Sequence, residues 1–437
     1  MVEVQELDAS ELAEIWPFTP PDERLEGFAL LDRPDAEDFF LDLSARDQAE
    51  LLLGLPPAQR RSWIRLLAPD DVADLIQEAP PDERDALLAL LDEPTRKEVS
   101  VLLAYAEDEA GGLMSPRFAR IRPEMSIDEA IGYLRRQAGR VETLYYAYVL
   151  DHEQRLLGVV SFRDLFSAPG NRVVVEVMET DVVAVHEEMD QESVARLFAE
   201  HDLVAIPVLD AERRMKGIVT IDDIVDVVEE ETTEDIHKMG GTAALEAPYL
   251  QTGLGELIRK RAGWLSVLFI GETFTATAIS FFQDQIAQAV VLVLFLPLII
   301  SSGGNSGSQA STLVIRAMAV GEVRLRDWWR VVRRELAMGI ALGSVLGLLG
   351  LARIVMGELA LGGYGEYFLL VGATVALSLV GVVLFGTIVG SMLPFLLRRL
   401  GFDPASASAP LIATLVDVTG LIIYFTTATL LLGGRLL

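Results

Sequence analysis

The chain has 437 residues, of which 51% are hydrophobic, and none is cysteine. This composition is too apolar for a disordered chain or an ordinary soluble globule, and the lack of cysteine excludes disulfides, iron–sulfur clusters and thiol catalysis. The net charge of −29 is unevenly divided, because residues 1–250 carry 55 acidic and 23 basic side chains and residues 251–437 carry 10 and 13. So acidic a first half disfavours binding to nucleic acid and suits binding to cations.

An acidic α-helical domain is predicted over residues 1–110. The N-terminus, MVEVQELDASELAEIW, has neither the basic nor the apolar region of a signal peptide, so we expect this half of the chain to stay in the cytoplasm. Apolar positions recur at helical spacing and are interrupted by turn-forming pairs such as Pro69-Asp70 and Pro80-Pro81. The pattern predicts an α-helical superhelix built from pieces of about 10–14 residues.

Two segments of similar sequence follow. In each copy an apolar strand with Leu-Asp at its end starts ten residues before a glycine, Gly158 or Gly217. Amphipathic helices are predicted at Ser126–Gln137 and Asp190–Glu200. The repeat resembles a tandem pair of CBS domains, which form a regulatory α/β module. The two domains would span residues 111–170 and 171–228.

Each copy carries a Ser/Thr-x-x-Asp pattern after its last strand, with Asp223 closing the second one. CBS pairs often bind adenosine nucleotides through this pattern. The resemblance therefore implies ATP or another adenosine nucleotide as a ligand, with Ser161, Asp164 and Thr220 as candidate contacts. The chain has neither a GxxxxGK[ST] motif nor a catalytic triad, so the sequence does not indicate an enzyme.

Residues 229–258 are predicted to connect the CBS pair to a membrane domain at residues 259–437. The stretch Ile224–Leu245 has a helix-forming composition and leads directly towards the first strongly apolar segment. We therefore expect one connecting, or plug, helix to join the cytoplasmic half to the membrane.

Five apolar stretches follow Arg261, each long enough to cross about 30 Å of hydrocarbon, for which ~20 helical residues suffice. Eleven basic residues flank one side of these stretches, and only Arg353 and Arg435 flank the other. The positive-inside rule places the eleven in the cytoplasm and the C-terminus outside, as in a multi-pass protein of the cell (inner) membrane. The spans are predicted at Ala262–Phe282, Ile286–Ser301 running on towards Ile315, Leu336–Met356, Tyr367–Leu397 and Pro410–Leu432.

Asp417 interrupts the last span. A carboxylate within a span costs ~2.5–3.5 kcal/mol on insertion scales, so it needs a compensating interaction. No Lys, Arg or His lies inside a span except Arg353, near an end, so Asp417 is predicted to face water or a cation. Glu272 in the first span either lines the same path or hydrogen-bonds a neighbouring helix.

The second span contains a run of small and polar residues, Ser301–Thr312. Such residues favour close packing of helices, although a pore lined by exposed carbonyls is the alternative. The fourth span is also rich in glycine, which indicates a packing face or a kink before Pro394. Candidates to line a path are Asn305, Gln309 and Thr414.

Together these segments are similar to the MgtE family of magnesium channels over nearly the whole chain. The matching motifs are EDEAGGLM at 107–114, TEDIHKMG at 233–240, GGNSGSQ at 303–309, and DPA at 403–405 followed by TLVD at 414–417. The resemblance implies a homodimer among membrane lipids, with a pore on its two-fold axis and Asp417 binding hydrated Mg²⁺. Two positions depart from the family pattern, because Ala409 and Ser308 stand where an Asn is usual.

The chemistry of Mg²⁺ agrees with this resemblance. Mg²⁺ holds its octahedral waters at about 2.0–2.1 Å and dehydrates reluctantly, so carboxylates can capture it by accepting hydrogen bonds from those waters. The chain offers hard oxygen ligands and no thiolate, which disfavours Zn²⁺ or Cu⁺.

The resemblance also implies Mg²⁺ ions that bind to the cytoplasmic half and hold the pore closed. Carboxylates this dense repel one another until a cation bridges them, although for any one of them a solvated acidic face is the alternative. Residues at matching positions are Asp38, Asp70, Asp74, Asp223, Asp226, Glu231, Glu234, Asp235 and Asp403.

Three other functions are alternatives to a Mg²⁺-gated Mg²⁺ channel. A coupled secondary transporter of divalent cations stays open. A membrane receptor that senses nucleotide and moves no ion is a different class, and Asp417 argues against it because an anchor has no use for a carboxylate within a span. A chloride channel with CBS domains is disfavoured by the negative charge.

Overall fold

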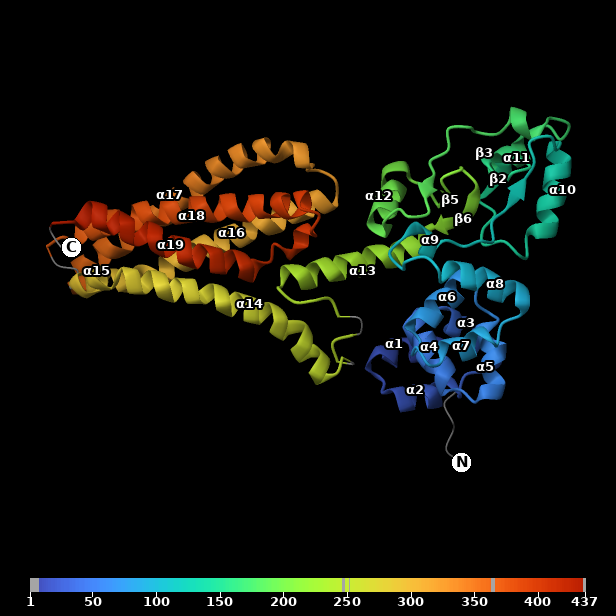
Figure 1. The fold of residues 1–437 in the computed structure, drawn as a ribbon, viewed down its shortest axis with the longest axis horizontal. Coiled ribbons are helices and arrows are strands. Elements are labelled where there is room, and N and C mark those ends of the chain that lie inside the picture. Colours follow the sequence, from blue (N-terminus) through green and yellow to red (C-terminus); the bar gives the residue numbers. More distant parts are fainter. Residues whose placement is uncertain (1–7, 246–247, 251, 363–365, 435–437) are drawn as a thin grey trace. The chain divides into compact units, whose positions relative to one another are not determined.

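The computed structural model describes residues 8–245, 248–250, 252–362 and 366–434 (Figure 1). The chain forms two compact units, Met1–Glu230 and Glu231–Leu437. Arg435, one of the two basic residues on the predicted outer side, lies outside the described residues.

The described part of the N-terminal domain is helical, as predicted. Its α-helices have 5 to 10 residues and are thus shorter than expected. They are short because the turn-forming pairs work as helix starts: Pro57 and Pro69 open helices, and Asp32 caps another. The elements are α1 (Ala9–Ile15), η1 (Trp16–Phe18), α2 (Pro21–Phe28), α3 (Arg33–Leu41), α4 (Ala45–Gly54), α5 (Pro57–Ile64), α6 (Pro69–Glu78), α7 (Arg84–Leu88) and α8 (Glu93–Leu102).

Arginine side chains fix the turns between these helices. Arg60 Nε donates to the Leu55 carbonyl and Arg84 Nε donates to the Ala79 carbonyl, at 2.9 Å in both cases. Carbonyls at helix ends have no partner within the helix, so such donors satisfy them. Because the same contact recurs in successive helix pairs, this domain is built from repeated units.

The two repeats after the N-terminal domain fold alike. In each, the first strand pairs in parallel with the second, and the second pairs antiparallel with the third. The predicted amphipathic helices are confirmed, with Ser126 and Asp190 as their N-caps. The elements are α9 (Ala110–Leu113), β1 (Arg120–Ile121), α10 (Ile127–Gln137), β2 (Tyr146–Leu150), β3 (Leu156–Ser161), α11 (Phe162–Ser167), η2 (Val174–Glu176), β4 (Val185–His186), α12 (Gln191–His201), β5 (Ala205–Leu209), β6 (Met215–Thr220) and α13 (Ile221–Met239).

Each repeat contributes a segment to the sheet of the other. Ser115, at the start of the first repeat, pairs with β6, and Glu179, at the start of the second, pairs with β3. A Cβ at Gly217 would lie 2.7 Å from the Ser115 oxygen, and one at Gly158 would lie 2.6 Å from the Glu179 oxygen. This close approach of two backbones explains why both copies carry a glycine at that point.

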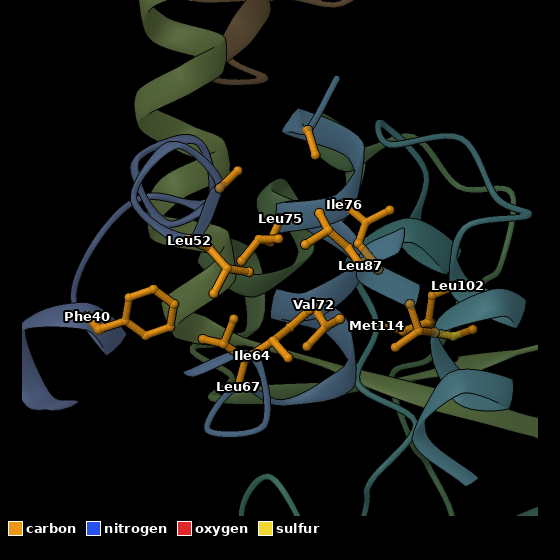
Figure 2. Close-up of a cluster of buried hydrophobic side chains, with 14 of the residues drawn as sticks. Phe40, Leu52, Ile64, Leu67, Val72, Leu75, Ile76, Leu87, Leu102 and Met114 are labelled. Carbon is orange, nitrogen blue, oxygen red and sulfur yellow. The ribbon is translucent and has the colours of Figure 1, made fainter. Parts of the chain in front are cut away.

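The N-terminal domain and the second repeat share one hydrophobic core. Figure 2 shows its centre, where Ile64, Val72 and Leu75 gather with side chains of neighbouring helices. Ile206 of β5 and Val227 of α13 belong to the same cluster. The core therefore holds helix α6 in the same compact body as the start of α13, which brings their acidic residues together.

Helix α13 begins directly after β6 and ends at Met239. The expected continuation to Leu245 was wrong, because two glycines follow and Gly241 has a φ of +75°, a conformation that favours glycine and ends helices. The Gly241 N–H donates to the Lys238 carbonyl at 2.9 Å, which closes the helix end.

Five helices among the described residues are long and apolar enough to cross a membrane, which confirms the predicted spans (Figure 1). The helices are α14 (Leu254–Phe281), α16 (Leu296–Ala319, after η3, Val290–Phe295), α17 (Trp328–Leu361), α18 (Phe368–Arg399) and α19 (Ala409–Leu432), and the short elements are α15 (Gln283–Gln288), η4 (Leu325–Asp327) and η5 (Pro404–Ser406). Charged and polar residues continue α14, α16, α17 and α18 beyond the apolar stretches at one or both ends. The predicted start of the second span at Ile286 was wrong, because that residue belongs to a separate short helix and the candidate span begins at Val290.

Glycines bring α16 and α18 into backbone contact. A Cβ at Gly386 or Gly390 of α18 would collide with the carbonyl of Gly303 or Gly307 on α16. Both pairs are spaced by four residues, so they form one stripe on each helix. The glycines in both spans are therefore packing residues, in line with the interpretation favoured by composition.

Candidate functional site

Asp417 lies half-buried on α19, with its carboxyl at hydrogen-bonding distance of the Glu272 carboxyl on α14. The two helices cross closely one turn earlier, where a Cβ at Gly271 would lie 2.7 Å from Thr414 Cγ2. Glu272 is the charged group that acts most strongly on Asp417. Two acidic groups in contact at low dielectric repel unless a positive charge is shared between them, so this pair is suited to attract a cation.

Asn305 and Gln309 lie on the face of α16 that is exposed in a single chain. Their neighbours Ser306 and Gly307 are buried against the other helices instead. The amide side chains are thus not used for packing within the described protomer. They remain available to a water-filled path or to another subunit.

The two positions at which the chain departs from the family pattern touch each other. The Ser308 hydroxyl lies 3.5 Å from the Ala409 carbonyl, and the nearby Ser311 hydroxyl donates to the Ala407 carbonyl at 3.0 Å. Serines therefore join α16 to the start of α19 in this chain, because a hydroxyl can bridge two closely packed backbones.

An acidic cluster forms in the first unit between the start of α6 and the start of α13. Asp70, Asp71 and Asp74 come from α6, Asp223 comes from α13, and Glu142 comes from the loop before β2. Asp70 is only 6% exposed, and its Oδ1 atom is buried without a hydrogen-bond partner. A buried carboxyl oxygen without a partner is unusual and fits a cation ligand.

The electrostatics of this cluster agree with a site for positive charge. Burial, followed by the nearby carboxylates, raises the pKa of Asp74 to about 8 and that of Asp70 well above its usual value. Burial raises the pKa of Asp223 to about 7, although a hydrogen bond from Thr220 opposes the shift. No three acidic or histidine side chains of the described residues are already arranged around one bare ion. An ion that keeps its waters would need less exact placement of these side chains.

The other predicted sensor residues are distributed along the chain. Asp38 is exposed on α3, where its charge lies close to Asp35 and not in the acidic cluster. Asp226 is an exposed residue of α13. Glu231 and Asp235 lie further along α13 and interact with other residues of the chain.

A lysine lies between two of the predicted metal ligands. Lys238 Nζ is 2.6 Å from Asp403 Oδ2 and also contacts the Glu234 carboxylate. Partial burial lowers the pKa of Lys238, but the hydrogen bonds to Asp403 and Glu234 outweigh it and raise the pKa above its usual value. This membrane-proximal group therefore already contains a cation.

The Ser/Thr-x-x-Asp patterns form helix caps in both repeats. The Ser161 hydroxyl donates to Asp164 at 2.5 Å at the start of α11, and the Thr220 hydroxyl donates to Asp223 at 2.8 Å at the start of α13. The pattern thus has a local structural role. In the first pair Ser161 is half-buried and Asp164 is exposed, while Thr220 of the second pair is buried.

Sequence reasoning missed Asp71, Glu142 and Lys238. Glu142 stands in a loop with no repeated motif, where its carboxylate accepts from the Ser115 hydroxyl at 3.2 Å. Nothing in the local sequence indicates that this loop meets α6. Lys238 carried a weak signal, because it follows Glu234 by four residues on a predicted helix.

The chain matches models of three protein families. A model described as divalent cation transporter, MgtE, matches residues 296–427. A model of the MgtE intracellular N domain matches residues 7–108, and a model of the CBS domain matches residues 110–171 and 174–230.

Individual magnesium transporters are also similar to the chain over nearly its whole length. The chain is 41% identical over 432 residues to a magnesium transporter of Thermus thermophilus, with 98% of this chain and 94% of that protein covered. It is 31% identical over 435 residues to one of Bacillus subtilis, covering 98% and 92%. Among solved structures, the cytosolic domain of the Mg²⁺ channel MgtE in complex with ATP is 42% identical, with a TM-score of 0.48 and coverage of 51% of this chain and 91% of that one.

Proposed function

The chain belongs to the MgtE family of magnesium transporters, and from that premise we propose that it is a Mg²⁺-selective channel that imports Mg²⁺ and closes when cytoplasmic Mg²⁺ is abundant. As a family member it is a multi-pass membrane transporter of Mg²⁺ with a cytosolic N-terminal domain, and not an enzyme. The proposal concerns the channel mechanism, the direction of transport, the outward C-terminus and the gating.

Asp417 carries the pore proposal. A carboxyl within a span, in contact with a second carboxyl and with no basic neighbour among the described residues, supports an ion-binding role. Hydrated Mg²⁺ could bind at these carboxyls, since its waters donate hydrogen bonds to carboxylates. Glu272 and Thr414 would line the same stretch of the path.

The working unit would be a homodimer. Asn305 and Gln309 are polar residues on an exposed face of α16, which supports a face turned towards water or a second copy. A two-fold axis would double the carboxylates of Asp417 and so strengthen the attraction for a divalent cation.

The gate would respond to Mg²⁺ bound at the acidic cluster. The unpartnered oxygen of Asp70 and the close approach of Asp74 to Asp223 support a site that binds cations when α6 and α13 are packed together. Ions that bind this packed state more tightly than an open one would shift the population towards closure. Asp226, Glu231, Glu234 and Asp235 on α13, and Asp403 on the α18–α19 connection, would contribute to this response, whereas Asp38 would act separately.

An adenosine nucleotide such as ATP would bind the CBS pair at Ser161, Asp164 and Thr220. The half-buried Ser161 at the start of α11 supports this role, because the start of a helix suits phosphate. The domain bounds proposed for this arrangement are 1–110, 111–170, 171–228, 229–258 and 259–437.

Flux into liposomes that contain a Mg²⁺ indicator tests the pore assignment. Asp417→Asn should abolish Mg²⁺ flux, because an amide cannot neutralise the ion, while the protein still elutes as a dimer on size exclusion. Asp284→Asn is the matched control, since Asp284 is an exposed carboxylate of α15. Flux of wild-type size in Asp417→Asn would refute the assignment. Imposed proton or sodium gradients that leave the reversal potential unchanged would favour a channel over a coupled transporter.

A further inference from the structure

The end of α13 is attached within the second unit by an ion-pair triad of Glu234, Lys238 and Asp403. Lys238 Nζ lies 2.6 Å from Asp403 Oδ2 and contacts Glu234 Oε1 on its own helix. The lysine side chain is 27% exposed and each acidic side chain is 35% exposed, so the triad is more shielded than an ordinary surface pair. Shielded pairs keep more of their attraction than exposed ones do.

Asp403 is held in place by its second oxygen. Its Oδ1 atom accepts a hydrogen bond from the Ala405 N–H at 2.8 Å, which fixes the carboxylate at the start of η5. A carboxylate that is already oriented loses less freedom when it binds a cation. The lysine therefore meets a prepared partner on the α18–α19 connection.

Apolar contacts surround this triad. Met239, the residue after Lys238, packs on a cluster of Ile315, Ala405 and Ala407. Two residues further on, a Cβ at Gly241 would lie 2.8 Å from the ring of Trp264. The charge pairing and the packing thus act at one junction, between the end of α13 and the helices α14, α16 and α18–α19.

A tethered ammonium competes strongly with a free ion for the same carboxylates. Its local concentration is fixed by the helix that carries it, as in any intramolecular contact. With Lys238 included, the triad carries a net charge of −1, whereas the two carboxylates alone carry −2. The attraction for a divalent cation is then about half as large.

We propose that Lys238 is the resident cation of this junction, so that α13 stays attached to the α18–α19 connection without a bound divalent ion. Glu234 and Asp403 are then attachment residues rather than Mg²⁺ ligands in this conformation. The Mg²⁺ signal is read at the acidic cluster of Asp70, Asp74 and Asp223. Only this last step rests on the proposed gating.

Cross-linking tests the attachment directly. The chain has no natural cysteine, so Met239→Cys and Ala407→Cys form a unique pair across the junction in the full-length protein. Wild-type Lys238 should allow the same oxidative cross-link in EDTA and in ~20 mM Mg²⁺. Lys238→Met, which keeps the apolar stem, should lower cross-linking in EDTA about fivefold, as expected for the loss of a partly shielded charge pair, and Mg²⁺ should restore it.

Two further variants keep the test decisive. Asp403→Lys alone should lose the cross-link, and the swap Lys238→Asp with Asp403→Lys should regain it in EDTA. Lys216→Met is the matched control, because Lys216 pairs with Asp210 at 3.5 Å in the other unit. A wild-type background that cross-links only with Mg²⁺, or a Lys238→Met variant that cross-links normally in EDTA, would overturn the proposal. Mg²⁺ flux that ignores cytoplasmic Mg²⁺ would instead refute the gating and leave the cross-linking result standing.

Discussion

Glu272 and Asp417 place two carboxyls in contact within apolar stretches of α14 and α19. Neither residue has a basic partner there among the described residues, so the attractions of the two carboxyls for a passing cation add together. Thr414 sets the spacing, because its methyl group fills the space beside Gly271 where α14 and α19 cross. A substitution that removes the charge of either acidic residue should therefore weaken the binding of the ion more than it destabilises the fold.

Glu272→Gln tests this at the scale of the residue. Removing one of two adjacent negative charges weakens the attraction for Mg²⁺, so initial flux at low Mg²⁺ should fall about tenfold, less than for Asp417→Asn. The measurement is indicator uptake into liposomes over a Mg²⁺ series, with Asp284→Asn as the control. Flux equal to wild type at every concentration would mean that Glu272 only hydrogen-bonds its neighbour.

At the scale of the element, close packing of α16 on α18 depends on the absence of side chains. Gly303 and Gly307 present their carbonyls to Gly386 and Gly390 with no space for a Cβ. Asn305 and Gln309 lie on the opposite face of α16 from these glycines, so the packing of α16 on α18 also orients the two amide side chains.

Gly386→Ala should destabilise the membrane unit, because overpacking a tight contact costs about 1–3 kcal/mol. The measurement is the loss of the monodisperse size-exclusion peak of detergent-solubilised protein after heating, which should occur at a lower temperature. Gly263→Ala is the control, since a Cβ there meets nothing within 4 Å on α14. Equal heat resistance of the two variants would contradict the packing argument.

At the scale of the whole molecule, the acidic cluster couples stability to pH and to Mg²⁺. The pKa of Asp74 is about 8 and that of Asp223 about 7, raised by burial above the usual value of 3.8. The folded state therefore binds more protons than the unfolded state between pH ~4 and ~8, and the free energy of unfolding falls as pH rises through that range.

The Tm of the metal-free protein should accordingly fall from pH ~6 to ~8.5, and Mg²⁺ should reverse the fall by replacing the lost protons. Asp74→Asn should flatten the dependence of Tm on pH, because an asparagine side chain does not ionise. Asp181→Asn, an exposed carboxylate of the second repeat, should leave the slope unchanged. The measurement is differential scanning fluorimetry of the full-length protein with and without Mg²⁺. A metal-free Tm that is constant or rises with pH would contradict this account.

The amino-acid sequence alone predicts the helical first domain, the two repeats, the five spans and the position of Asp417 within the last one. These features follow from local spacing, hydrophobic length and repeated motifs, which need no knowledge of distant contacts. The folded chain is needed to see that Glu272 meets Asp417, that Glu142 joins Asp70, and that Lys238 pairs with Asp403. Each of these pairs is distant in sequence, so its formation depends on how whole helices pack, and no local pattern records that geometry.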